Sequence, residues 1–224
     1  MILALETVFD HCAVALLTLK GDTLTQQTLI GNRQQTQQIL PLIQTLMSEQ
    51  SVAFTDLTAI AFNRGPGAFS GIRINTAVAQ ALAFAHDLPC LPVSSLQAVA
   101  QRAFDSEIQG VEQVQAVIDA RMNEVYFGEY HLQEGIMQLV GEEKLLAYGA
   151  TCDNNFPLVG NGATLLTARA DQIVIDTVVP SAVTIGKLGA NLLANGGQVS
   201  AEHALPVYLR HNAWKTLVEQ NKKS

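Results

Sequence analysis

The sequence has few cysteines and no long apolar run. Its three cysteines are an odd number without a C-x-x-C spacing, so neither a disulfide framework nor a thiolate zinc site is indicated. Residues 1–19 are apolar but have no basic leader, and Glu6 and Asp10 interrupt them, which argues against a signal peptide or a membrane span. We therefore expect a cytoplasmic chain with free thiols and no membrane segment.

Positive charge is also scarce. The 20 acidic residues outnumber the 13 lysines and arginines, the formal net charge is −7, and the clearest basic cluster is Lys222 with Lys223. Such a chain has no sequence-wide attraction to phosphate backbones. If a nucleic acid is a partner, we expect another protein to hold most of it.

The spacing of histidines that marks a helical metal site is missing. No histidine lies three or four residues from another, although two ligands on one helical face need that spacing. We therefore predict no metal site built from histidine. Four acidic side chains leave two interpretations open. They could hold a divalent cation in a cleft, or they could have ordinary roles in turns and on the surface. The acidic candidates are Glu6, Asp10, Asp119 and Glu124.

The sequence shows no recognisable nucleophile with its base. The serines Ser70, Ser94 and Ser95 lie outside any G-x-S-x-G segment, the local signature of many serine hydrolases. Cys12 directly follows His11 in a predicted strand, where adjacent side chains point to opposite faces. No catalytic residue is predicted, and a peptidase activity stays an alternative to be tested.

Apolar patterning in the first half predicts three strands and then a helix. Residues 2–7, 12–19 and 23–30 have the β-branched and apolar character of a meander. Residues 33–50 carry apolar side chains at steps of three and four, which is the helical period, and Pro41 indicates a kink or a late start there. Further predicted elements are strands at 57–62 and 90–93, a helix at 71–86, and a helix opened by a capping box of Ser94 and Gln97.

The second half repeats this order of elements after a polar stretch at residues 105–113. A meander followed by a helix, a strand and a helix occurs twice in the chain. This order suits an α/β fold of two RNase-H-like lobes that face each other across a cleft, each with a mixed sheet flanked by helices. The lobes are predicted at residues 1–105 and 106–224. The second set of elements comprises strands at 114–118, 124–130 and 136–140, a glycine-rich turn at 160–162, a helix at 164–170, a strand at 173–175 and a helix at 181–194.

A glycine-rich segment at residues 63–73 connects a predicted buried strand to a long helix. Glycines permit close approach of the backbone, and a helix start favours an anion, which makes a phosphate cradle one interpretation. The other is a tight strand-to-helix connection with Ser70 as N-cap. The segment is neither a P-loop nor G-x-G-x-x-G. The residues of the candidate anion loop are Gly65, Gly67, Ser70, Gly71 and Arg73.

The helix predicted after this segment is apolar nearly all round. Between residues 72 and 85 only Arg73, Asn75, Thr76 and Gln80 are polar. A helix that covers one sheet face needs a single apolar stripe, so a second side must be covered as well. Either the other helices of its own lobe or a partner chain can supply that cover.

Several segments together resemble the TsaB family. The most specific is residues 65–73, and the remaining segments follow in the family's order over essentially the whole chain. They are residues 88–89, 93–96, 119–126, 159–163 and 206–210. The resemblance implies the fold shared by actin, Hsp70 and the sugar kinases.

The resemblance also implies a function without catalysis by this chain. TsaB-like proteins pair with a catalytic relative, TsaD, and with a small ATPase, TsaE. The assembly transfers threonylcarbamoyl from threonylcarbamoyl-AMP to N6 of the adenosine 3′ of the tRNA anticodon, so tRNA is expected to bind only through the complex. TsaD-like catalysts use an H-x-x-x-H pair, which this sequence lacks.

In the family, two helices of the first lobe contact TsaD or, without it, form a homodimer. Carried onto this chain, the contact uses residues 33–50 and 71–85. The candidate interface residues are Ile39, Ile43, Leu46, Met47, Ile74, Val78, Ala81 and Leu82.

A nucleotide-dependent enzyme acting alone is the second hypothesis. Nucleotide-binding members of this fold place an Asp in the first hairpin, where this chain has Glu6. The resemblance implies no cofactor held tightly by this chain alone, and it leaves ATP or ADP at the partner interface open. A lone ATPase or small-molecule kinase predicts tight nucleotide binding by the isolated chain.

Overall fold

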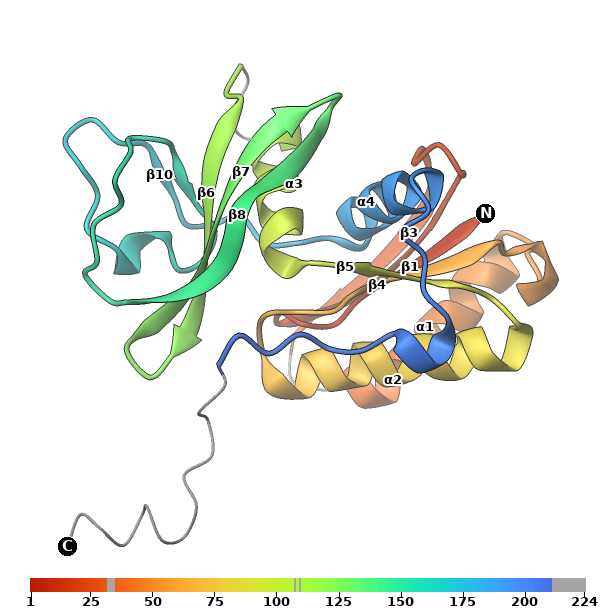
Figure 1. The fold of residues 1–224 in the computed structure, drawn as a ribbon. Coiled ribbons are helices and arrows are strands. Elements are labelled where there is room, and N and C mark those ends of the chain that lie inside the picture. Colours follow the sequence, from red (N-terminus) through yellow and green to blue (C-terminus); the bar gives the residue numbers. More distant parts are fainter. Residues whose placement is uncertain (32–34, 107, 109, 211–224) are drawn as a thin grey trace, which may run out of the picture.

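The computed structural model describes residues 1–31, 35–106, 108 and 110–210 and contains two sheets of five strands each (Figure 1). The predictions that concern Arg33, Lys222 and Lys223 lie outside the described residues. In the first sheet the strand order is β3-β2-β1-β4-β5. The strands are β1 (Ile2–Glu6), β2 (His11–Leu17), β3 (Thr23–Ile30), β4 (Ala59–Asn63) and β5 (Cys90–Val93).

The second sheet repeats the topology of the first. Its order is β10-β9-β6-β7-β8, and in both sheets an antiparallel three-strand meander continues into two parallel strands. The predicted α/β class with two mixed sheets is therefore confirmed. The strands are β6 (Gln113–Arg121), β7 (Glu124–Gln133), β8 (Ile136–Ala147), β9 (Leu158–Val159) and β10 (Val174–Ile175).

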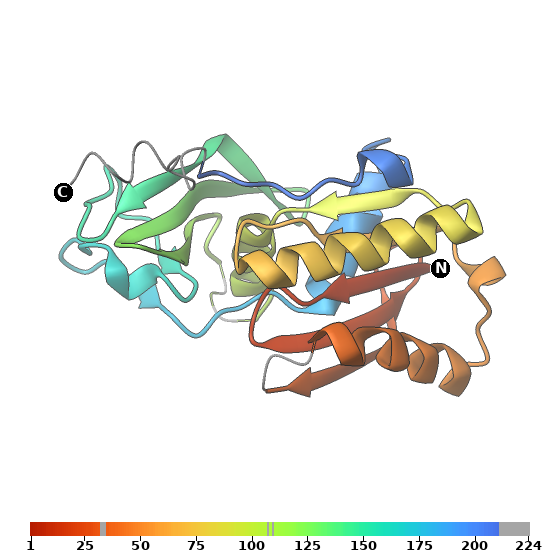
Figure 2. The ribbon, with the colours of Figure 1, turned by 90° about the horizontal axis from the view of Figure 1, so that it is seen from below.

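Helices cover both faces of the first sheet. The helices α1 (Gln35–Glu49) and α2 (Phe69–His86) lie on one face, and α4 (Ala182–Ala194) lies on the other (Figure 2). All five residues of β1 are buried, because helices cover both faces of the strand. The first four are apolar, as expected for a strand that is covered on both faces. The main core thus surrounds the first sheet.

The helix α3 (Ser95–Ser106) lies between the two sheets and packs against the second one. In return α4, from the second half of the chain, packs against the first sheet. The two halves therefore exchange one helix each. Division at residues 105 and 106 stays a prediction, but a cut there separates α4 from the sheet that it covers.

Several predicted boundaries need correction. The predicted helix at 164–170 is only a 3-10 turn, Ala163–Leu165, because Thr167 turns away to bridge with Thr151. The helix α2 begins at Phe69, so Ser70 is not its N-cap; Ala68 takes that position without a side-chain hydrogen bond. Pro41 lies inside α1, which starts six residues earlier, so the helix start is not delayed. Two further 3-10 turns are Phe54–Asp56 and Ala201–His203.

Within the described residues, none of the helices is both long and apolar enough to cross a membrane.

Candidate functional site

A cleft of about 560 Å³ lies between the two lobes. The β1–β2 turn, the start of α2, the β6–β7 turn and the chain near residue 210 all contribute to its walls. Four of the six segments that carried the resemblance therefore meet here, while residues 88–89 and 93–96 do not line the cleft. The lining residues are Val8, Phe9, Asp10, Gly67, Ala68, Phe69, Arg73, Ile118, Asp119, Ala120, Arg121, Met122, Tyr126, Asn161, Tyr208 and Arg210.

Two glycines of the candidate anion loop are used for packing. A Cβ on Gly71 would lie 2.3 Å from the carbonyl oxygen of Thr7, and the Thr7 hydroxyl donates to the Gly71 carbonyl at 2.9 Å. Gly65 has a φ of +96°, a conformation that favours glycine, and it is buried. These positions are explained by a tight strand-to-helix connection.

The other part of the candidate anion loop reaches the cleft. Gly67 and Arg73 line it, whereas Ser70 is exposed on α2. The Arg73 guanidinium stacks 3.5 Å from the centroid of the Phe69 ring, and its Nε donates to the Tyr208 hydroxyl at 3.2 Å. Among the described residues Arg73 has no acidic partner. Anion binding at this loop stays a prediction.

The β6–β7 turn forms the opposite wall and is fastened by Arg210. Three successive residues of the turn, beginning with Arg121, have φ values of 60°, 56° and 63°. Arg210 Nε donates to Glu124 at 3.0 Å, and its Nη2 donates to the carbonyl oxygens of Ala120 and Arg121. The sequence offered no signal for this tie beyond the resemblance at residues 206–210, because its partners lie more than 80 positions away.

The four acidic candidates do not form a cation site. Glu6 is fully buried and bonded within the first lobe, Asp119 pairs with Arg121 at 3.0 Å, and Glu124 pairs with Arg210. Among the described residues no group of three His, Cys, Asp or Glu side chains is placed to hold a metal ion. The divalent-cation alternative is therefore wrong for this set of residues.

Glu6 instead organises a buried polar network. Its carboxylate accepts from the Val8 N–H at 2.6 Å and from the Asn63 side-chain amide. The Asn63 side-chain oxygen accepts from Gly65 N at 2.9 Å and from the Ser95 hydroxyl at 2.6 Å. Burial raises the pKa of Glu6 to about 7, although the bonds from Asn63 and Val8 oppose this change. The network joins the β1–β2 turn, the end of β4 and the start of α3.

The three serines have structural partners or none. The Ser94 hydroxyl accepts from the N–H groups of Leu96 and Gln97, which confirms Ser94 as the cap of α3. The Gln97 side chain donates to Met137 at 2.9 Å, so it does not complete the capping box. Ser95 donates to Asn63, and Ser70 is exposed. In the described part of the chain no hydrogen bond joins any of them to a histidine, and the peptidase alternative gains no support.

Half of the candidate interface residues are in the core. The four on α1 are at most 4% exposed, because the apolar stripe of α1 faces β2. Their assignment to a surface contact is corrected accordingly. The residues concerned are Ile39, Ile43, Leu46 and Met47.

The four candidates on α2 do reach the surface. Ile74, Val78 and Leu82 are half-buried and Ala81 is exposed. Two large apolar side chains that the sequence did not single out lie on the same two helices: Leu40 is 54% and Phe84 is 84% exposed. A groove of about 470 Å³ runs between Leu40 and Leu82. We call Leu40, Ile74, Ala77, Val78, Ala81, Leu82 and Phe84 the α1–α2 apolar face.

Known proteins resemble the whole chain. A family model described as TsaD, tRNA N6-adenosine threonylcarbamoyltransferase, matches residues 29–216. The tRNA threonylcarbamoyladenosine biosynthesis protein TsaB of Escherichia coli is 35% identical, over 96% of this chain and 97% of its own length. The protein of that name from Haemophilus influenzae is 34% identical over 96% of both chains.

The chain belongs to the TsaB family. A solved structure of YeaZ from Pseudomonas aeruginosa superposes with a TM-score of 0.84 at 40% identity, covering 93% of this chain and 99% of that one. The TsaB relatives thus share the length of this chain, and the YeaZ structure shares its fold.

The pH dependence of stability tests the Glu6 network. Between its ordinary pKa of about 4.5 and the folded-state value of about 7, the folded protein holds a proton on Glu6 that the unfolded chain releases. The free energy of unfolding therefore falls as pH rises through this interval. The Glu6→Gln variant lacks this proton. We therefore expect its free energy of unfolding to fall over the same pH interval by about 1–3 kcal/mol less than that of the natural chain. Urea denaturation of both proteins at several pH values measures it, and parallel profiles would contradict the prediction.

Proposed function

We propose that this TsaB-family chain is a non-catalytic accessory subunit in the synthesis of threonylcarbamoyladenosine in tRNA. The observation that carries the proposal is the α1–α2 apolar face, which includes an 84% exposed Phe84. Large apolar side chains exposed on one face mark a site of interaction with another protein. The relatives named as biosynthesis proteins for this modification support the choice of process.

The proposed partner is a TsaD-like catalytic subunit, with a TsaE-like ATPase in the same assembly. The catalyst is expected to cover the α1–α2 apolar face, and in its absence a second copy of this chain is expected to occupy the same surface. The net charge of −7 favours tRNA binding through the complex rather than by this chain alone. The assembly is expected in the cytoplasm, where tRNA is modified.

A stand-alone ATPase or kinase is the second candidate, because a cleft of about 560 Å³ is present. Where nucleotide-binding members of this fold have an acidic residue in the first hairpin, this chain has Glu6. Its side chain is 0% exposed and hydrogen-bonded to Asn63. It therefore does not face a ligand in the cleft. We expect ATP or ADP to meet this chain only at the partner interface, and no reacting group to come from it.

Reconstitution tests the function directly. Unmodified tRNA, TsaD, TsaE, the adenylate donor and ATP are combined with and without this chain, and the modified nucleoside is quantified. We expect product only when the chain is present, and calorimetry of the isolated chain with ATP should give no tight binding. Equal product without the chain, together with tight ATP binding, would favour the stand-alone enzyme.

A charge on the α1–α2 apolar face tests the interface. Ala81 is exposed, so Ala81→Glu leaves the fold intact but places an unpaired carboxylate in an apolar contact. We expect co-elution with TsaD and formation of the modified nucleoside to fall at least about tenfold. The matched control is Leu139→Glu on β8, where the apolar side chain is 40% exposed. The interface is wrongly placed if Ala81→Glu behaves like Leu139→Glu.

A further inference from the structure

A second cavity, of about 520 Å³, adjoins the cleft, and Phe9, Asp10 and Asn161 line both. We call it the rear cavity. Side chains from β2 and β3, from α3 and from the segment leading into α4 line it, among them Asp10, His11, Thr28 and Arg102. Its volume is in the ordinary range of small-molecule sites, and none of the residues singled out for function requires it.

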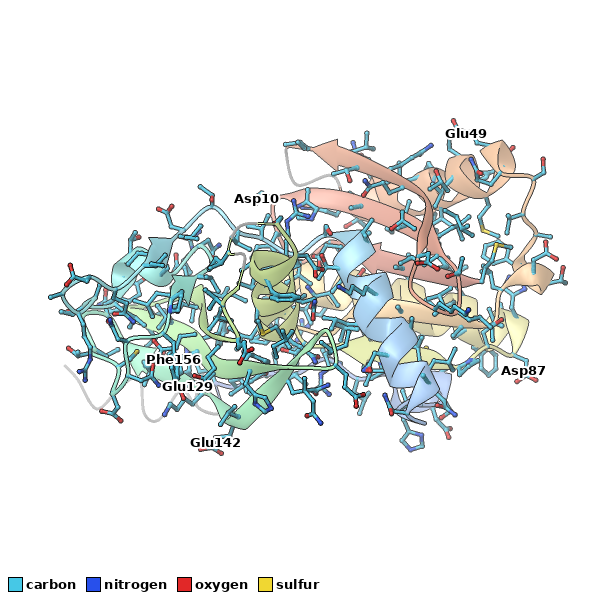
Figure 3. All side chains as sticks on the ribbon, turned by 90° about the horizontal axis from the view of Figure 1, so that it is seen from above. Asp10, Glu49, Asp87, Glu129, Glu142 and Phe156 are labelled. Atoms are coloured by element: carbon cyan, nitrogen blue, oxygen red, sulfur yellow. The ribbon has the colours of Figure 1, made fainter. Side chains whose placement is uncertain are left out.

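The rear cavity contains two opposite charges that do not neutralise each other. Arg102 on α3 and Asp10 beyond the end of β1 both line it, and Figure 3 shows Asp10 beside α3 at the end of the first sheet. No ion pair within 4 Å joins them. Among the described residues neither the guanidinium nor the carboxylate has a hydrogen-bond partner, although both act electrostatically on the His11 ring.

Two of the arginines that line the adjoining cleft have acidic partners. There Arg121 pairs with Asp119 at 3.0 Å, and Arg210 pairs with Glu124. Asp10 is exposed and Arg102 is half-buried, so a ligand that enters from solvent can reach both. The two residues lie on different structural elements that both line the rear cavity.

The rest of the lining is neutral and partly apolar. Burial, followed by the positive charge of Arg102, lowers the pKa of His11, so the ring carries no charge at neutral pH. Gln26 and Thr28 offer uncharged hydrogen-bonding groups, and Phe9 and Val179 offer apolar surface. A bound molecule would thus meet one cation, one anion and an apolar wall.

We propose that the rear cavity binds a small zwitterion of the α-amino-acid class, with its carboxylate on Arg102 and its ammonium group on Asp10. The apolar wall takes the side chain of the ligand. Two charges of opposite sign on one small molecule match a cation and an anion that are held apart. This site goes beyond the accessory function proposed above and does not depend on a partner protein.

A ligand panel tests the charges with the natural protein. The full chain is titrated with L-amino acids by NMR, up to about 10 mM, since so small a ligand reaches a Kd of about 1 mM. We expect saturable one-to-one binding of at least one amino acid. Its N-acetyl and amide derivatives, which lack one charge each, should bind at least about tenfold more weakly. The proposal is overturned if no amino acid saturates, or if both derivatives bind equally well.

Substitutions locate the site. Arg102→Gln and Asp10→Asn should each weaken binding at least about tenfold, while Arg121→Gln, which removes a charge of the cleft alone, should bind like the natural chain. Thermal melting shows whether each variant is folded. If a variant is not folded, the ligand panel with the natural chain tests the proposal in its place. Unchanged binding in both rear-cavity variants, or a loss in Arg121→Gln instead, would contradict the assignment.

Discussion

The contact between the first turn of α2 and the β1–β2 hairpin determines where the functional surfaces lie. Gly71 brings the helix so close that a Cβ would meet the Thr7 carbonyl oxygen at 2.3 Å. The Asn75 side chain, one helical turn later, donates to the carbonyl oxygens of Leu5 and Asn63 at 3.1 and 2.9 Å. Side-chain amides thus hold the helix to the backbone of β1 and β4. A helix anchored at such short range has one fixed orientation.

That orientation gives α2 one end at the cleft and one outer face. Its first turn places Phe69 and Arg73 on the wall of the cleft. Its outer side, with Ala81 and Phe84, stays open to solvent, although a helix with that composition is ordinarily covered. The same helix therefore contributes both to the cleft wall and to the face that we assign to a partner.

The sequence was sufficient for the order of the elements in the first half of the chain, whereas in the second half it missed β9 and predicted a helix where the structure has a 3-10 turn. The edge strand β3 and the strand β5 have the predicted bounds, since turn residues on both sides limit them. The helix α4 begins after Ser181, whose hydroxyl caps Thr184 N. Local chemistry of this kind is visible in the sequence because the interacting residues are neighbours.

Features that depend on tertiary packing could not be predicted from the sequence in the same way. The stripe of Ile39 and Ile43 has the same period whether it faces a sheet or a partner, and the structure places it in the core. Arg210 and Glu124 are 86 positions apart, as Asp10 and Arg102 are far apart along the chain. Such long-range arrangements depend on tertiary packing and have no local signal in the sequence.

Thiol labelling with and without TsaD tests the central claim that the outer side of α2 is the partner surface. The three native cysteines are buried, and burial raises the pKa of Cys12 and Cys90 to about 11, so they react slowly. A cysteine introduced by Ala81→Cys is then labelled selectively, with Leu139→Cys as the reference position. The account predicts that TsaD slows labelling at position 81 at least about tenfold and leaves position 139 unchanged. Equal labelling rates at position 81 with and without a TsaD that demonstrably binds the chain would contradict it.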